Sequence, residues 1–131
     1  MTLLKPLRLG FLACATIAVA LAAGPAFAHA KLLSEAPAAE DAANTPVTAA
    51  SVTELRLSFS EALNAAFSKA VVKDAMGMVV VGKMALDPQD SKVLVVTFGA
   101  ALAKGEYTVD WTAVAGDGHK TTGTYKVNVA Q

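Results

Sequence analysis

The sequence predicts an all-β domain, a Greek-key β-sandwich or barrel of about seven short strands. Apolar and polar residues alternate with period two in several segments, and turn residues separate these segments at short spacing. Beyond the first 28 residues, no stretch of ten or more shows convincing helical spacing of apolar side chains. A length of 131 residues allows one domain at most. The 11 basic and 11 acidic side chains balance without a basic stripe, which argues against a nucleic-acid partner.

The first 28 residues have the pattern of a cleaved secretory signal peptide. Lys5 and Arg8 precede an apolar run over residues 9–23, and Ala26-Phe27-Ala28 forms a small-residue cleavage box. We therefore expect a removed leader, residues 1–28, and an exported domain, residues 29–131. Because the leader contains two basic and no acidic residues, the mature domain would keep 9 basic and 11 acidic side chains, a formal net charge of −2.

Two alternatives for the leader fit less well. As a membrane anchor, its apolar run of about 15 residues is shorter than the roughly 20 that a bilayer span needs. As a lipoprotein signal with Cys14 lipidated, it would leave only about three apolar residues after Arg8, where 7 to 15 are usual. Cys14 is the chain's single cysteine. The mature domain would therefore lack disulfides and depend on its hydrophobic core.

The mature region is expected to begin with a loop and continue as strands. Residues 36–50 are alanine-rich and contain two prolines, which indicates a surface loop with at most one helical turn. From residue 51 apolar and polar side chains alternate, which places Leu55, Leu57 and Phe59 on one face of a strand. Further strands are expected at Lys69–Lys73, Met78–Val81, Val93–Phe98, Tyr107–Val114 and Thr122–Val129.

Two connections have local patterns of their own. Leu63 and Phe67, four residues apart, fit either a short helix or a bent connection. The segment from Leu102 to Tyr107 has the L-x-x-G-x-Y form that resembles a tyrosine corner, a structural feature of Greek-key sandwiches. Trp111, on the alternating strand that follows, is expected to belong to the core.

His29 would become the first residue of the mature domain after cleavage. An N-terminal histidine offers its α-amine and its imidazole Nδ1 to one metal ion, and an α-amine with a pKa of roughly 7.7 to 8.0 can lose its proton to a metal near neutral pH. Alternatively, His29 is an incidental residue that happens to follow the cleavage site.

The only other histidine lies in the turn Gly116-Asp117-Gly118-His119. It is either an ordinary hairpin turn with solvated side chains or a site where Asp117 and His119 face one point. With His29, they would supply three nitrogens and one carboxylate oxygen, a set that suits Cu(II). The absence of a mature cysteine removes the thiolate typical of zinc and blue-copper sites.

The mature region resembles the CopC family of periplasmic copper-binding, copper-resistance proteins. The matching segments are His29-Ala30-Lys31-Leu32, Ser34, Pro37-Ala38, Phe59-Ser60-Glu61, Gly105 to Trp111, Asp117-Gly118-His119 and Gly123. The resemblance implies an Ig-like, cupredoxin-related β-barrel that binds one Cu(II) through a histidine brace. Carried over, His29 and His119 would be ligands, Asp117 a further oxygen ligand, and Glu61 a nearby carboxylate that binds copper or supports its ligands.

The resemblance also implies a function. We expect a non-catalytic, monomeric carrier or buffer of Cu(II) that serves copper homeostasis or resistance and passes copper to an inner-membrane importer on a separate chain. The alternatives are an exported Ig-like interaction module without metal and a histidine-brace oxidative enzyme.

The chain departs from some family members at a second site. Those proteins bind Cu(I) through a methionine cluster with one histidine, because thioethers are the soft donors that Cu(I) prefers. Here the corresponding region holds only Met76, Met78 and Met84, without a histidine. Since methionine more often fills apolar space, we expect Cu(II) binding only.

Overall fold

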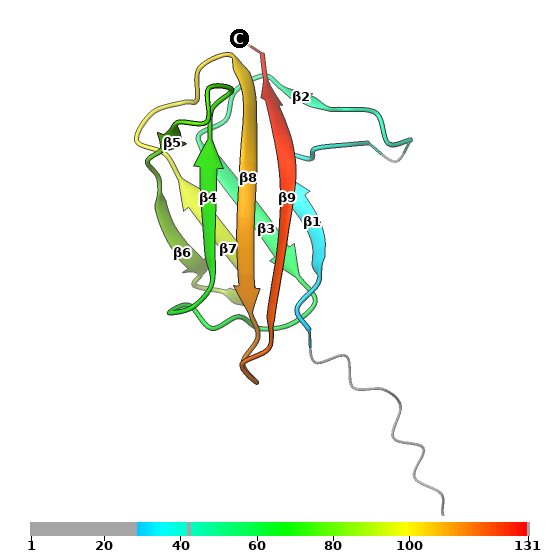
Figure 1. Ribbon diagram of the computed structural model, residues 1–131, viewed down its shortest axis with the longest axis vertical. Coiled ribbons are helices and arrows are strands. Elements are labelled where there is room, and N and C mark those ends of the chain that lie inside the picture. Colours follow the sequence, from blue (N-terminus) through cyan, green and yellow to red (C-terminus); the bar gives the residue numbers. More distant parts are fainter. Residues whose placement is uncertain (1–28, 42, 131) are drawn as a thin grey trace, which may run out of the picture.

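The computed structural model describes residues 29–41 and 43–130, so the predicted leader and Cys14 lie outside the described residues. Within this part the chain forms nine strands in two sheets and no helix (Figure 1). None of its described segments is therefore a helix able to cross a membrane. The predicted all-β sandwich is confirmed, with nine strands in place of about seven.

Each sheet combines strands that are distant in sequence. The first has the spatial order β1 (Leu32–Ala36), β3 (Glu54–Phe59), β7 (Asp90–Thr97) and β6 (Lys83–Asp87), all antiparallel neighbours. The second has the order β2 (Thr48–Ala49), β9 (Lys120–Val129), β8 (Gly105–Val114), β4 (Lys69–Lys73) and β5 (Val79–Val80). Only β2 runs parallel to its partner, β9. Because the connections β3–β4, β5–β6 and β7–β8 cross between sheets, both layers share one core.

That core follows the predicted alternation. Leu55, Leu57 and Phe59 of β3 are buried, whereas the residues between them are half-buried. Trp111 of β8 is half-buried and packs against this core, with its ring edge-to-face on Phe59 at a centroid distance of 5.2 Å. Burial of such side chains is the main stabilising term for a domain without disulfides.

The tyrosine corner is confirmed. The Tyr107 hydroxyl donates a hydrogen bond of 2.9 Å to the Ala103 carbonyl. Gly105, between them, has a φ of 149°, in a region that favours glycine. This contact fixes the chain where β8 enters the second sheet.

Neither of two connections between strands forms a helix in the described part of the chain. The described residues of the loop 36–50 form no helical turn; this segment contributes β2 and an isolated bridge between Glu40 and Pro46. The β3–β4 connection is bent rather than helical, since Leu63 is buried and bridges to Ala115 while Phe67 is 66% exposed.

Acid should weaken the second sheet through Asp110. Its carboxylate accepts hydrogen bonds from Lys73 Nζ at 2.9 Å and Thr124 Oγ1 at 2.7 Å, and the Lys73 bond in particular holds the pKa of Asp110 below its ordinary value. A lowered folded-state pKa adds stability above the unfolded value of about 3.9, which is lost as the pH falls through the folded value. We expect the free energy of unfolding, measured with urea at pH 7 and pH 3, to drop less in Asp110→Asn than in the parent. An equal drop would contradict this role for Asp110.

Candidate metal centre

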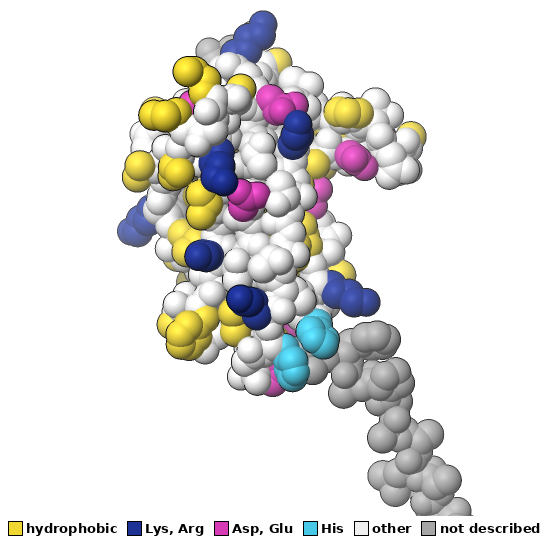
Figure 2. Space-filling model, in the orientation of Figure 1, with side chains coloured by type: hydrophobic (Ala, Val, Ile, Leu, Met, Phe, Trp, Pro, Cys, Tyr) yellow, Lys and Arg dark blue, Asp and Glu magenta, His cyan; other side chains and the backbone are white. Residues whose placement is uncertain are grey.

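The two histidines lie side by side at one end of the sandwich. His29 precedes β1, and His119 lies in the turn between β8 and β9. Their ring centroids are 5.0 Å apart, with the ring planes inclined at 61°. Both side chains are exposed at the end of the molecule where the β8–β9 turn projects (Figures 1 and 2). The fold thus brings together the two nitrogen-bearing rings that the sequence analysis selected.

The β8–β9 turn has a defined backbone. The amide of Ala115 donates to the His119 carbonyl and the amide of Gly118 donates to the Ala115 carbonyl, each at 2.9 Å. Gly118 has a φ of 90°, which a residue with a Cβ rarely adopts. The glycine therefore allows a turn tight enough to present Asp117 and His119 together.

Both carboxylate oxygens of Asp117 are directed at His119. Oδ1 accepts the His119 backbone N–H at 3.0 Å, and Oδ2 lies 2.9 Å from ring Nδ1. The pKa of Asp117 is held below its ordinary value by the hydrogen bond from the backbone, which is the larger cause, and by the ring contact, which is the smaller one. The carboxylate is therefore anionic near neutral pH.

This contact leaves the second ring nitrogen of His119 for a metal. The 2.9 Å between Asp117 Oδ2 and His119 Nδ1 is an ordinary hydrogen-bond distance. A carboxylate that contacts one ring nitrogen sets the orientation of the ring, and the other nitrogen, Nε2, can then bind a metal ion.

Three hydrogen bonds hold the chain just after His29. Thr121 Oγ1 donates to the carbonyl of Ala30 at 2.5 Å, and Ala30 itself is fully buried. The Lys31 amide donates to Ser60 Oγ, and the Ser60 amide donates to the Lys31 carbonyl, both at 2.9 Å. His29 is thus attached to a segment fixed between β9 and the end of β3.

The hydrogen bonds of Thr121 and Ser60 to the segment after His29 were not expected from the sequence. One signal was available for Thr121. It shares the inward phase of β9 with Val127 and Val129, where an apolar residue would be usual, so a threonine there indicates a specific partner. Nothing comparable distinguishes Ser60 from an ordinary loop serine.

Glu61 is not joined to the histidines. It follows Ser60 and is half-buried, and in the described part of the chain no hydrogen bond or ion pair links it to His29, Asp117 or His119. Across residues 29–41 and 43–130, no three His, Cys, Asp or Glu side chains are grouped as a metal site. The expected brace would differ from such a group, because one of its donors would be the α-amine of His29, which exists only if the bond to Ala28 is cut.

The three methionines occupy different surroundings. Met76 and Met78 are exposed, and their backbone amides donate to Asp74 Oδ1. The Met84 sulfur accepts the backbone N–H of Ala70 at 3.1 Å, linking β6 to the part of β4 that does not pair with β5. Met84 therefore already has a structural contact between the two sheets.

Comparison with known proteins places this geometry in a family. Residues 34–130 match the family model described as the CopC domain. Protein YobA of Escherichia coli K12 is 37% identical over 118 residues, covering 89% of this chain and 91% of that protein. Copper resistance protein C of Pseudomonas syringae pv. tomato is 37% identical over 108 residues, covering 76% of this chain and 81% of that protein.

Solved structures show the same fold. PcoC, a methionine-rich copper resistance protein from Escherichia coli, superposes with a TM-score of 0.69 and 32% identity, covering 79% of this chain and all of that one. CopC from Methylosinus trichosporium OB3b superposes with a TM-score of 0.66 and 26% identity, covering 77% and 93%. The family model spans most of the described chain, and the two relatives are each 37% identical to this chain over the aligned residues, so this protein belongs to the CopC family.

Proposed function

We propose that the mature chain, beginning at His29, binds one Cu(II) ion between its N-terminus and the β8–β9 turn. The ligands are the α-amine and one ring nitrogen of His29, the His119 ring and Asp117 Oδ2, with Glu61 as a carboxylate on the neighbouring loop. The observation that carries the proposal is the 5.0 Å separation of the two histidine rings. Several relatives are named copper resistance proteins, which supports the proposal.

The donor set favours Cu(II) over other divalent ions. Three nitrogens and one anionic oxygen suit a tetragonal ion, and Cu(II) binds such donors more tightly than Zn(II) does. The Asp117 carboxylate is anionic near neutral pH, so it adds a full negative charge beside the ion. The mature chain offers no thiolate, which zinc and blue-copper sites commonly use.

We further propose that the protein is a monomeric periplasmic carrier or buffer rather than an enzyme. Residues 1–28 direct the export of the chain, and their cleavage creates the terminal amine of His29. The exposed rings allow an incoming or departing copper ion to reach the site directly, as transfer to an inner-membrane importer on another chain requires. An anionic ligand stabilises Cu(II) against reduction, so copper-loaded protein with ascorbate should release no peroxide above the level of the metal-free protein.

A melting experiment tests binding. Cu(II) at about 100 times its Kd should add about 2.7 kcal/mol to the free energy of unfolding, a rise in Tm of about 10 °C or more for a domain of this size. The increase should saturate at one equivalent, and Zn(II) should produce a smaller rise. No rise with Cu(II) would favour a metal-free interaction module.

The Thr121–Ala30 hydrogen bond should contribute to copper affinity. Thr121→Val keeps the side-chain shape but leaves the buried Ala30 carbonyl without this donor. A hydrogen bond contributes about 1 kcal/mol, so the Kd for Cu(II) should rise about 5-fold as His29 becomes less fixed. Competition titration against a chelator measures the change. Thr122→Val, on the outward face of the same strand, is the matched control and should leave the Kd unchanged; equal effects would contradict the anchoring role.

A further inference from the structure

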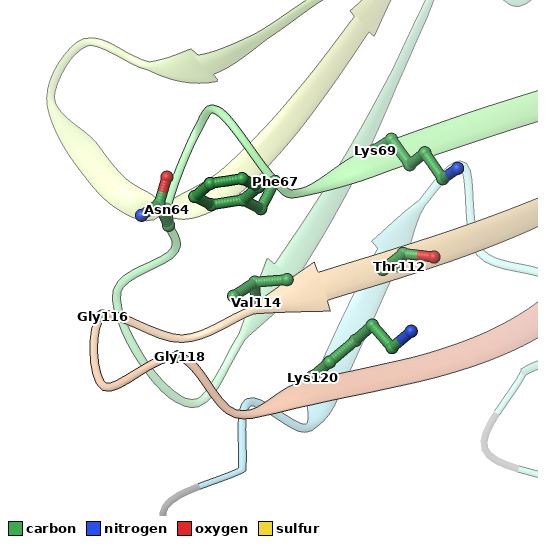
Figure 3. A pocket seen from close by; sticks show the side chains of 8 residues that line it. All are labelled: Asn64, Phe67, Lys69, Thr112, Val114, Gly116, Gly118 and Lys120. Atoms are coloured by element: carbon green, nitrogen blue, oxygen red, sulfur yellow. The ribbon is translucent and has the colours of Figure 1, made fainter.

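A groove lies beside the proposed copper site. It has a volume of about 630 Å³ and is formed by the β3–β4 connection and the outer face of β4, β8 and β9 (Figure 3). Its lining residues are Asn64, Phe67, Lys69, Thr112, Val114, Gly116, Gly118 and Lys120. The size falls in the range of small-molecule pockets. Gly116 and Gly118 flank Asp117, so the groove and the copper donors share one turn.

The groove is cationic. Lys69 pairs in register with Thr112, and Lys120 with Val114, so both lysines extend from strands on either side of β8 over the same sheet face (Figure 3). None of the eight lining residues is acidic. In the described part of the chain neither lysine has an ion-pair partner, whereas Lys73 and Lys126 on this face pair with Asp110 and Glu106. Two uncompensated positive charges therefore face the groove.

One wall of the groove is apolar. Phe67 is 66% exposed, and its ring lies at the groove on the β3–β4 connection, near Val114 (Figure 3). The connection is held in place by hydrogen bonds between the Asn64 amide and the Val114 carbonyl and between the Val114 amide and Ser68 Oγ. An aromatic side chain on a fixed loop can cover the carbon skeleton of a small ligand.

We propose that this groove receives copper as a small anionic carboxylate chelate of Cu(II). The inference rests on the proposed copper site. Carboxylates of the chelate contact Lys69 and Lys120, and its carbon skeleton contacts Phe67. The Cu(II) ion then exchanges its carboxylate ligands for the donors of His29, His119 and Asp117 without a change of oxidation state. The proton displaced from the His29 α-amine passes to solvent, and the chelator leaves as the free anion. Because the mature domain is formally negative, local positive charge is needed to attract such a complex.

Loading rates test the proposal. Stopped-flow fluorescence of Trp111 follows transfer from Cu(II) nitrilotriacetate, an anionic complex, and from Cu(II) diethylenetriamine, a cationic one. Replacing Lys69 and Lys120 together with glutamine should slow loading from the anionic complex about 10-fold and should not slow loading from the cationic one. The equilibrium Kd for Cu(II) in Lys69→Gln should match the parent. Lys104→Gln, which removes a lysine that has no ion pair among the described residues and lies outside the groove, is the control and should slow loading much less.

A copper-free probe separates this proposal from the copper site itself. Citrate, titrated into the metal-free protein, should shift the amide NMR signals of Thr112, Gly116 and Lys120, and the double lysine variant should lose these shifts. If citrate shifts these amide signals but the protein does not bind copper, the groove proposal stands and the proposed copper site is refuted. Equal slowing from both complexes, equal slowing by Lys104→Gln, or no citrate shifts would refute the groove proposal.

Discussion

The variant His119→Ala is expected to bind Cu(II) at least about 100-fold more weakly than the mature parent, because loss of a direct ligand should exceed the 10–100-fold cost of losing an outer-shell partner. His119 supplies one of the two rings that meet at 5.0 Å, and it also orients Asp117 through two contacts. Its replacement by alanine therefore removes a nitrogen donor and the ring contact of Asp117, whereas the backbone N–H contact of residue 119 with Asp117 remains. Competition titration gives the affinity, and the electron paramagnetic resonance spectrum should lose one nitrogen coupling.

Folding must be separated from binding in that experiment. The His119 side chain is 52% exposed, so the free energy of unfolding of the metal-free variant should lie within about 0.5 kcal/mol of the parent value. Asp117→Asn keeps the side-chain shape but removes the charge. Its affinity for Cu(II) should lie between that of the parent and that of His119→Ala. If His119→Ala binds as tightly as the parent while remaining folded, the turn does not contribute a ligand.

The variant Phe59→Ala is expected to lose about 3–5 kcal/mol of stability, the usual cost of truncating a buried phenylalanine. Phe59 is 1% exposed and supports Trp111 from the opposite sheet. Domains of this kind are stable by about 5–15 kcal/mol, so the loss is a large part of the total. Urea unfolding of the metal-free protein measures it. The change should also weaken copper binding, since Ser60, which fixes the segment after His29, is the next residue.

Phe67→Ala is the matched control for Phe59→Ala. The same side chain is removed from a position that is 66% exposed, so the free energy of unfolding should change by no more than about 0.5 kcal/mol. Equal losses for the two variants would contradict the assignment of Phe59 to the core and of Phe67 to the surface.

The strands that alternate clearly were predictable, and the edge strand β5 lies within the expected strand Met78–Val81, but the edge strands β1, β2 and β6 were not predicted. Lys69–Lys73 agrees with β4 at both ends, and Leu55, Leu57 and Phe59 face inward as expected. By contrast, β1 has no alternation, because it forms one edge of the first sheet and its residues are exposed or half-buried. β6 lies at the other edge and was missed for the same reason. Edge strands bury too little to leave a periodic signal.

The site was only partly predictable. Asp117 and His119 are close in sequence, and a glycine turn that directs both to one point can be inferred locally. The approach of His29 depends on how β1 and β3 are placed relative to β9, which no local pattern encodes; it was expected from the family resemblance. The Thr121 and Ser60 contacts depend on the same long-range arrangement, and the groove depends on the loop that places Phe67 over Val114.

The most direct test concerns the free amine of His29. Two forms of the domain are compared by electron paramagnetic resonance and competition titration with Cu(II): one that begins at His29 with a free α-amine and one in which that amine is acetylated. The first should bind one ion in a single species with three nitrogen ligands and one oxygen ligand. The second, whose His29 nitrogen is an amide, should lose one nitrogen coupling and bind at least about 100-fold more weakly. Identical spectra and affinities for the two forms would contradict the proposed copper site.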